Sequence, residues 1–169
     1  MRLKRIMNKV IGISVLVLTA LLFACTSYSG SEHQQSDHVG NITEQELLES
    51  YSAFQQEYHQ FQLTEQQKQQ VSEINQALTI DIYFGTWCHD SEREVPRMLK
   101  ALKEQPNISV NLVALDYEKQ EPQGRAKANS IRFTPTFIIK NEQGELGRII
   151  ERPKLDLISD LVHITDQQG

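Results

Sequence analysis

Cysteine is scarce in this sequence, and so are tryptophan and long hydrophobic runs. The 169 residues include two cysteines, Cys25 and Cys88, too few for the multiple disulfides that hold small secreted scaffolds together. The apolar run Val10–Ala24 is shorter than the roughly 20 residues that a membrane-spanning helix needs. Basic residues are outnumbered 17 to 22, giving a formal charge of -5, so we expect no nucleic acid partner.

The N-terminal residues show the order of features found in exported lipoproteins. Residues 1–9 carry four basic side chains, and the apolar run follows them, as in a secretory signal peptide. The run ends in Leu22-Phe23-Ala24-Cys25, which resembles the lipobox of bacterial lipoproteins, where cleavage before the cysteine is coupled to its lipidation. We therefore expect a signal peptide at 1–24 and a lipidated Cys25 as the membrane anchor. An uncleaved anchor and an ordinary signal peptide with an incidental Cys25 are the alternatives.

The resemblance to lipoproteins implies an extracytoplasmic protein held in the cell envelope. Where the Gram-negative sorting rule applies, Thr26 in place of Asp implies the outer membrane, facing the periplasm. Cleavage removes four basic and no acidic residues, which shifts the formal charge from -5 to -9. If Cys25 is acylated, Cys88 is the only free thiol, and any disulfide that it forms must be with another molecule.

Residues 25–42 are predicted to form the lipidated cysteine and a flexible tether. The segment is rich in Ser, Gln, His and Gly, and it has too few apolar residues to bury a core. His33 and His38 are interpreted as solvated linker side chains, because no further metal ligands lie nearby in the sequence. We expect no bound metal and no cofactor.

Residues 43–78 are predicted to form a helical extension. Thr43 and Glu46 have the spacing of a capping box, and a second helix begins near Thr64. Apolar residues recur at alternating spacings of four and three, as on one face of an amphipathic helix: Leu47, Tyr51, Phe54, Tyr58 and Phe61. This stripe could bind a partner helix, or it could pack on its own domain.

From residue 79 the pattern changes to strands alternating with helices. The predicted strands are Thr79–Phe84, Ile108–Leu115, Thr136–Lys140 and Leu146–Glu151. The last two flank Asn141–Gly144, which is a hairpin turn signal. The predicted helices are Ser91–Leu102, a weaker one within 122–130, and one from Leu155 onward. This order predicts an α/β fold with a mixed central sheet covered by helices on both faces.

The segment Phe84–Pro96, FGTWCHDSEREVP, resembles the redox motif of the thioredoxin family. Trp87 and Cys88 follow a strand and open a helix, Pro96 stands where the family has a kinking proline, and Thr134-Pro135-Thr136 matches the family's cis-proline loop. The resemblance implies a thioredoxin-like three-layer fold over residues 79–169. It also implies that Thr134 and Pro135 face the cysteine and offer backbone groups to a bound peptide.

Cys88 is the candidate nucleophile. A cysteine at the start of a helix lies beside unpaired backbone N–H groups and the positive end of the helix dipole, which favours the thiolate, the attacking species. Trp87 and His89 flank it. Protonated His89 would favour the thiolate further, while Asp90 and the glutamates that follow would oppose it.

Two positions depart from the family pattern. Ser91 stands where a dithiol enzyme has its second cysteine, and a hydroxyl cannot resolve a mixed disulfide, so release needs an external thiol. Ser91 could donate a hydrogen bond to the Cys88 thiolate or cap the helix. Ile82 occupies the place of the family's buried acid, and Asp81 should lie on the opposite face of the strand. Both departures argue against a general dithiol reductase.

The sequence is compatible with two functions of different classes. One is monothiol exchange with disulfides or oxidised thiols of exported client proteins, by reduction, isomerisation or deglutathionylation; threonine before the proline is frequent in family members of this kind. The other is a peptide- or protein-binding module in which Cys88 does not turn over. Copper handling and peroxide reduction are disfavoured, because a single cysteine leaves the soft ligand set incomplete and the motif does not resemble a peroxidatic site.

Overall fold

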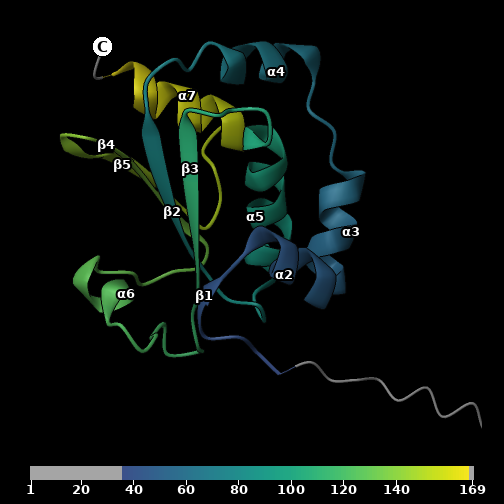
Figure 1. The fold of residues 1–169 in the computed structure, drawn as a ribbon, viewed down its shortest axis with the longest axis vertical. Coiled ribbons are helices and arrows are strands. Elements are labelled where there is room, and N and C mark those ends of the chain that lie inside the picture. The colour runs from purple at the N-terminus through teal and green to yellow at the C-terminus, as the bar shows by residue number, and fades with distance from the viewer. Residues whose placement is uncertain (1–35, 168–169) are drawn as a thin grey trace, which may run out of the picture. The chain divides into compact units, whose positions relative to one another are not determined.

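Five strands form one mixed sheet in the computed structural model, which describes residues 36–167 (Figure 1). They are β1 (Gly40–Ile42), β2 (Leu78–Phe84), β3 (Ile108–Ala114), β4 (Thr136–Asn141) and β5 (Gly144–Ile150), in the order β1-β3-β2-β4-β5. β2 and β3 are parallel, and the other neighbouring pairs are antiparallel. The predicted signal peptide, the lipidation site Cys25 and tether residues 25–35 lie outside the described residues.

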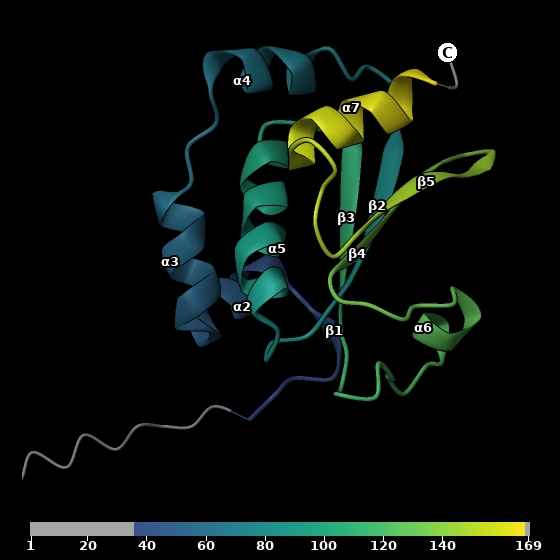
Figure 2. The same ribbon diagram turned by 180° about the vertical axis from the view of Figure 1, so that it is seen from behind.

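Helices lie on both sides of this sheet (Figures 1 and 2). They are α2 (Glu44–Ser50), α3 (Ser52–Gln60), α4 (Glu65–Ser72), α5 (His89–Leu102), α6 (Arg125–Ala128) and α7 (Leu157–Asp166). Buried side chains form two clusters, one on each face: the larger includes α5 and α7 residues, and the smaller includes Ala126 of α6. The predicted three-layer α/β architecture with a mixed sheet is therefore confirmed.

The face of the sheet under α6 carries less apolar packing than the opposite face. α6 has four residues, and apolar packing on this side is limited to the end of the sheet where Tyr83 and Ile138 are buried. Farther along the same face, Asp81 accepts a hydrogen bond from Asn111 Nδ2 at 2.8 Å and forms an ion pair with Lys140. Polar side chains that satisfy one another need no helix above them.

The N-terminal helices share the core of the sheet. Leu47 and Phe54 are fully buried in the larger cluster, so the stripe packs on its own domain. The predicted capping box at Thr43 is present, with Glu46 N–H donating to Thr43 Oγ1 at 3.1 Å. The expected single helix is two helices, because the backbone at Tyr51 is extended, with ψ of 100°, between α2 and α3.

The last residues of the predicted tether form an edge strand. Gly40, Asn41 and Ile42 pair antiparallel with Ala114, Val113 and Leu112 of β3. The tether prediction is therefore wrong for residues 40–42, because Ile42 buries its side chain in the core and the backbone gains a partner strand. No helix within 36–167 has the length and apolar character needed to cross a bilayer.

Candidate active site

Cys88 lies where β2 gives way to α5. It is the N-cap residue of α5, with extended backbone angles, and its N–H donates to the Gly85 carbonyl at 3.1 Å to close the turn. The thiol is partly exposed. No side chain caps this end of α5, so the N–H groups of its first turn have no side-chain partner at the helix end that carries Cys88.

The loop before β4 faces this cysteine from a distant part of the chain. The Thr134–Pro135 peptide bond is cis, and Cys88 Sγ donates a hydrogen bond to the Thr134 carbonyl oxygen at 3.2 Å across 46 residues of sequence. Thr136 Oγ1 donates to the Phe133 carbonyl at 2.8 Å, which links the two sides of the proline. The structure thus brings together Cys88, Thr134 and Pro135, three residues singled out in the sequence.

Ser91 supports the turn that carries Cys88. Its side chain is fully buried, and its Oγ accepts a hydrogen bond from the Gly85 N–H at 3.3 Å. Ser91 is the third residue of α5, so it does not cap the helix, and that alternative is wrong. Among the hydrogen bonds of residues 36–167, none joins Ser91 Oγ to Cys88 Sγ. Ile82 is fully buried, as a residue in the place of a buried acid would be.

The charged residues that follow Cys88 are paired with one another. His89 is almost fully exposed, and the hydrogen bond from its Nδ1 to Glu92 Oε2, at 2.8 Å, raises the pKa of His89, assisted by the Glu92 charge. Burial alone would raise the pKa of Asp90, but hydrogen bonds from Arg93 at 2.7 Å and Arg152 at 3.1 Å outweigh it and lower the pKa. The acidic side chains expected to oppose the thiolate are therefore paired with basic ones: Glu92 with His89, Asp90 with Arg93 and Arg152, and Glu94 with Arg93.

Trp87 forms one wall of the site. Its Nε1 donates to the Leu115 carbonyl at 3.0 Å, and its ring stacks on Tyr117 with centroids 4.4 Å apart and an interplanar angle of 19°. The Lys119 ammonium lies 4.9 Å from the centre of the Trp87 ring. The ring covers Gly85, where any Cβ would lie 2.5 Å from Trp87 Cε2. A glycine is required at this position by close approach.

Sequence reasoning missed several residues around the site. Tyr117 and Phe133 are 60% and 49% exposed, on the loops that flank the Trp87–Cys88 turn and Pro135. Asp37, in the predicted tether, accepts a hydrogen bond from Thr86 Oγ1 at 3.2 Å. None of these residues belongs to a periodic pattern. For Tyr117, the one available signal was an aromatic residue between polar neighbours, which could have indicated an exposed contact residue.

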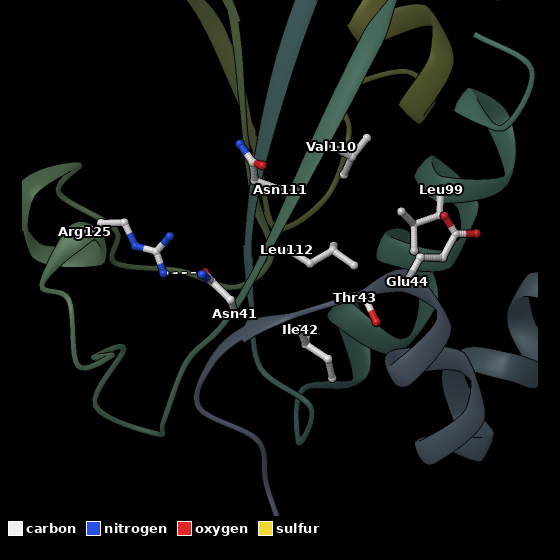
Figure 3. Close-up of a pocket in the computed structure, with 9 residues that line it drawn as sticks. All are labelled: Asn41, Ile42, Thr43, Glu44, Leu99, Val110, Asn111, Leu112 and Arg125. Atoms are coloured by element: carbon white, nitrogen blue, oxygen red, sulfur yellow. Dashed lines mark hydrogen bonds between the residues drawn. The ribbon is translucent and has the colours of Figure 1, made fainter. Parts of the chain in front are cut away.

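Two of the cavities within residues 36–167 lie beside β3 and beside α5. One of about 400 Å³ opens along the edge of β3, with Leu99 on one side of the strand and Asn41 and Arg125 on the other (Figure 3). The second, of about 350 Å³, lies between α3 and α5 and includes His89 and Glu92. Within the described part of the chain, no group of three or more His, Cys, Asp or Glu side chains could hold a metal ion.

A family model for thioredoxin matches residues 41–161 of this sequence. No curated protein matches it. Among solved structures, a protein of unknown function from Pseudomonas aeruginosa is 16% identical, with a TM-score of 0.58, covering 76% of this chain and 99% of its own. An HIV epitope scaffold is 18% identical, with a TM-score of 0.57, covering 74% of this chain and 86% of its own. At these identities the likeness is one of fold.

Proposed function

This chain belongs to the thioredoxin family, and from that premise we propose that it exchanges disulfides with client proteins through Cys88 alone. The fold supports a thiol–disulfide redox role at the level of the family. The finer proposal, a monothiol exchange, is supported by Ser91 in the place of a second cysteine.

One observation carries the proposal: Cys88 combines a helix start with a facing peptide loop. The free N–H groups of the first turn of α5 favour negative charge on the sulfur. The Thr134 carbonyl, 3.2 Å from Sγ, marks the backbone edge along which an extended client segment would lie. A client disulfide bound to this loop would therefore be presented to the nucleophile.

In the proposed reaction, the Cys88 thiolate attacks one sulfur of a client disulfide. The client's S–S bond breaks, its second sulfur leaves as a thiolate and takes up a proton, and a mixed disulfide joins Cys88 to the client. For reduction, two external thiols release first the client and then Cys88 and leave as one disulfide, so they supply the two electrons. For isomerisation, a thiol of the client itself displaces Cys88 without net electron transfer.

The surface around Cys88 supports a polypeptide client. Tyr117 and Phe133 are large, exposed side chains on the loops that precede α6 and Pro135, so both are accessible to a bound polypeptide. The site is also supported by Trp87, His89 and Ser91 in the roles described above. We propose exported proteins with disulfides or oxidised thiols as the clients.

The N-terminal sequence extends the proposal to location. We propose that residues 1–24 direct export and that Cys25 is lipidated, which would hold the domain at the cell envelope with its site outside the cytoplasm. In a Gram-negative cell, Thr26 favours the outer membrane, facing the periplasm. Such a compartment contains proteins with disulfides, as the proposed chemistry requires.

A second candidate function is peptide binding without turnover. The observation that favours it is the same 3.2 Å contact, because a thiol that donates to the Thr134 carbonyl is protonated, and that bond is lost on ionisation. In this alternative, Cys88 fills the space beneath a bound peptide, and its replacement by alanine would leave the binding intact.

Trapping of clients on Cys88 tests the proposal. Cells producing the full chain are treated with acid and a thiol-blocking reagent, and the protein is followed on non-reducing gels. Because the domain has no resolving thiol of its own, we expect disulfide-linked adducts that disappear on reduction and in Cys88→Ala. Ser91→Cys is the matched control, since a second thiol in place of the Ser91 hydroxyl should release the adducts and weaken the bands. Wild-type chain without adducts would contradict the exchange function.

A further inference from the structure

The segment Ser36–Val39 lies against the site before it enters β1. Tyr51 donates from its hydroxyl to the Ser36 carbonyl at 3.1 Å, and His38 Nε2 lies 2.8 Å from the Asn41 carbonyl oxygen. Figure 2 shows this segment at the end of the sheet where α5 begins. The segment therefore has a defined path along the active-site end of the domain.

Asp37 is the residue of this segment that reaches the site. Its Oδ1 accepts a hydrogen bond from Thr86 Oγ1 at 3.2 Å, and Thr86 is 6% exposed and immediately precedes Trp87. Burial raises the pKa of Tyr117, and the negative charge of Asp37 raises it further. Tyr117 in turn stacks on Trp87 at 4.4 Å. Asp37 thus acts on Thr86 through a hydrogen bond and on Tyr117 through its charge.

We propose that Asp37 is a positioning residue that fixes the wall formed by Trp87 and Tyr117 beside Cys88. It restrains the turn through its hydrogen bond to Thr86, the residue before Trp87, and Trp87 in turn stacks on Tyr117. A fixed wall reduces the conformational freedom that a client must remove on binding, which improves client affinity more than thiol reactivity. This consequence for clients rests on the proposed function, whereas the positioning of the two rings does not.

Through Asp37, the segment Ser36–Val39 has a role in the site. The proposed lipidation site, Cys25, precedes Asp37 in the sequence, and Asp37 contacts the turn that carries Trp87 through Thr86. Removal of the Asp37 contact should loosen the wall without touching the sulfur, the Thr134 carbonyl or the start of α5.

The physical test uses Trp87, the only tryptophan in the chain. In Asp37→Ala we expect stronger acrylamide quenching of its emission, and a tyrosinate titration of Tyr117, assigned by difference from Tyr117→Phe, that moves to lower pH. Asp37→Asn keeps an acceptor oxygen for Thr86 but removes the charge, so quenching should stay near wild type while the titration still moves. Asp166→Asn, an exposed acid on α7, removes the same charge at the far end of the domain and should change neither.

The functional test compares two substrates. Asp37→Ala should slow reaction of Cys88 with a disulfide-linked peptide about fivefold, the loss expected for one hydrogen bond of about 1 kcal/mol, and should leave reaction with a small aromatic disulfide unchanged. Equal quenching and an equal Tyr117 titration in wild type and Asp37→Ala would overturn the positioning role. If wild type reacts with neither substrate, the proposed exchange function fails, and quenching and titration still decide the role of Asp37.

Discussion

Replacing Gly85 by alanine tests how the turn before Cys88 is built. A Cβ at this position would lie 2.5 Å from Trp87 Cε2 and 2.9 Å from Trp87 Nε1, closer than van der Waals contact allows. The backbone of Gly85 needs no left-handed conformation, and the three atoms nearest to the added Cβ all belong to the indole ring. The variant must therefore move Trp87 away from the turn.

The loss of stability follows from the two contacts that Trp87 gives up when it moves. Its hydrogen bond to the Leu115 carbonyl, at 3.0 Å, contributes about 1 kcal/mol to stability. Its stack on Tyr117 contributes about 1 kcal/mol beyond the buried area. We therefore expect Gly85→Ala to lower the free energy of unfolding by about 2 kcal/mol.

A double-mutant cycle with Trp87→Ala measures this cost and isolates its cause. The four proteins are unfolded in urea and followed by far-ultraviolet circular dichroism, because two of them contain no tryptophan. With the indole removed, Gly85→Ala should be nearly neutral, so the coupling energy should be about 2 kcal/mol. An equal loss of stability with and without the indole would refute the close-approach argument.

Three further predictions concern the stability and charge of the domain. Ser91→Ala leaves the buried Gly85 N–H without its acceptor and should cost about 1–2 kcal/mol in urea unfolding; a cost of only a few tenths would contradict this. Glu92→Gln removes the bond and charge that raise the pKa of His89, so the His89 titration in NMR should move to lower pH. Because the pKa of His89 is raised in the folded state, its protonation stabilises the wild type fully below pH 6.5, the unfolded value, and this stabilisation is lost as pH rises through the folded value. Glu92→Gln should therefore be less stable than wild type at acidic pH and closer to it at alkaline pH. A difference in unfolding free energy between the two proteins that does not change with pH would contradict this link. Phe54→Ala empties a fully buried site and should cost about 3–5 kcal/mol in the same unfolding assay, whereas less than 1 kcal/mol would place this ring outside the core.

The sheet could be predicted from sequence because its strands follow local rules. β2, β3 and β4 contain alternating or consecutive apolar residues, and a turn signal at Asn141–Gly144 separates β4 from β5. Each of β2 to β5 is predicted within two residues of its observed bounds. β1 could not be predicted, because three residues, Gly40–Ile42, hold no pattern and their partner β3 lies far along the chain. The break at Tyr51 was missed for the opposite reason, since the apolar stripe continues through it without interruption.

The candidate site also contains residues that could be predicted from sequence and residues that could not. The resemblance to thioredoxins indicated Cys88, Thr134 and Pro135, and the structure places Cys88 Sγ against the Thr134 carbonyl. The resemblance could not indicate Tyr117 or Asp37. Their contacts with Trp87 and Thr86 depend on how two irregular segments fold back over this turn. Such contacts are set by tertiary packing and have no sequence period.

The reactivity of Cys88 is the most direct test of a working nucleophile. In a Cys25→Ser chain, Cys88 is the one remaining thiol, and its alkylation by iodoacetamide can be timed by mass spectrometry at neutral pH. The same protein unfolded in urea is the control, because it has the thiol without the helix start. The account predicts faster alkylation in the folded protein than in the unfolded one. Equal or slower alkylation of the folded protein would show that the start of α5 does not activate the sulfur.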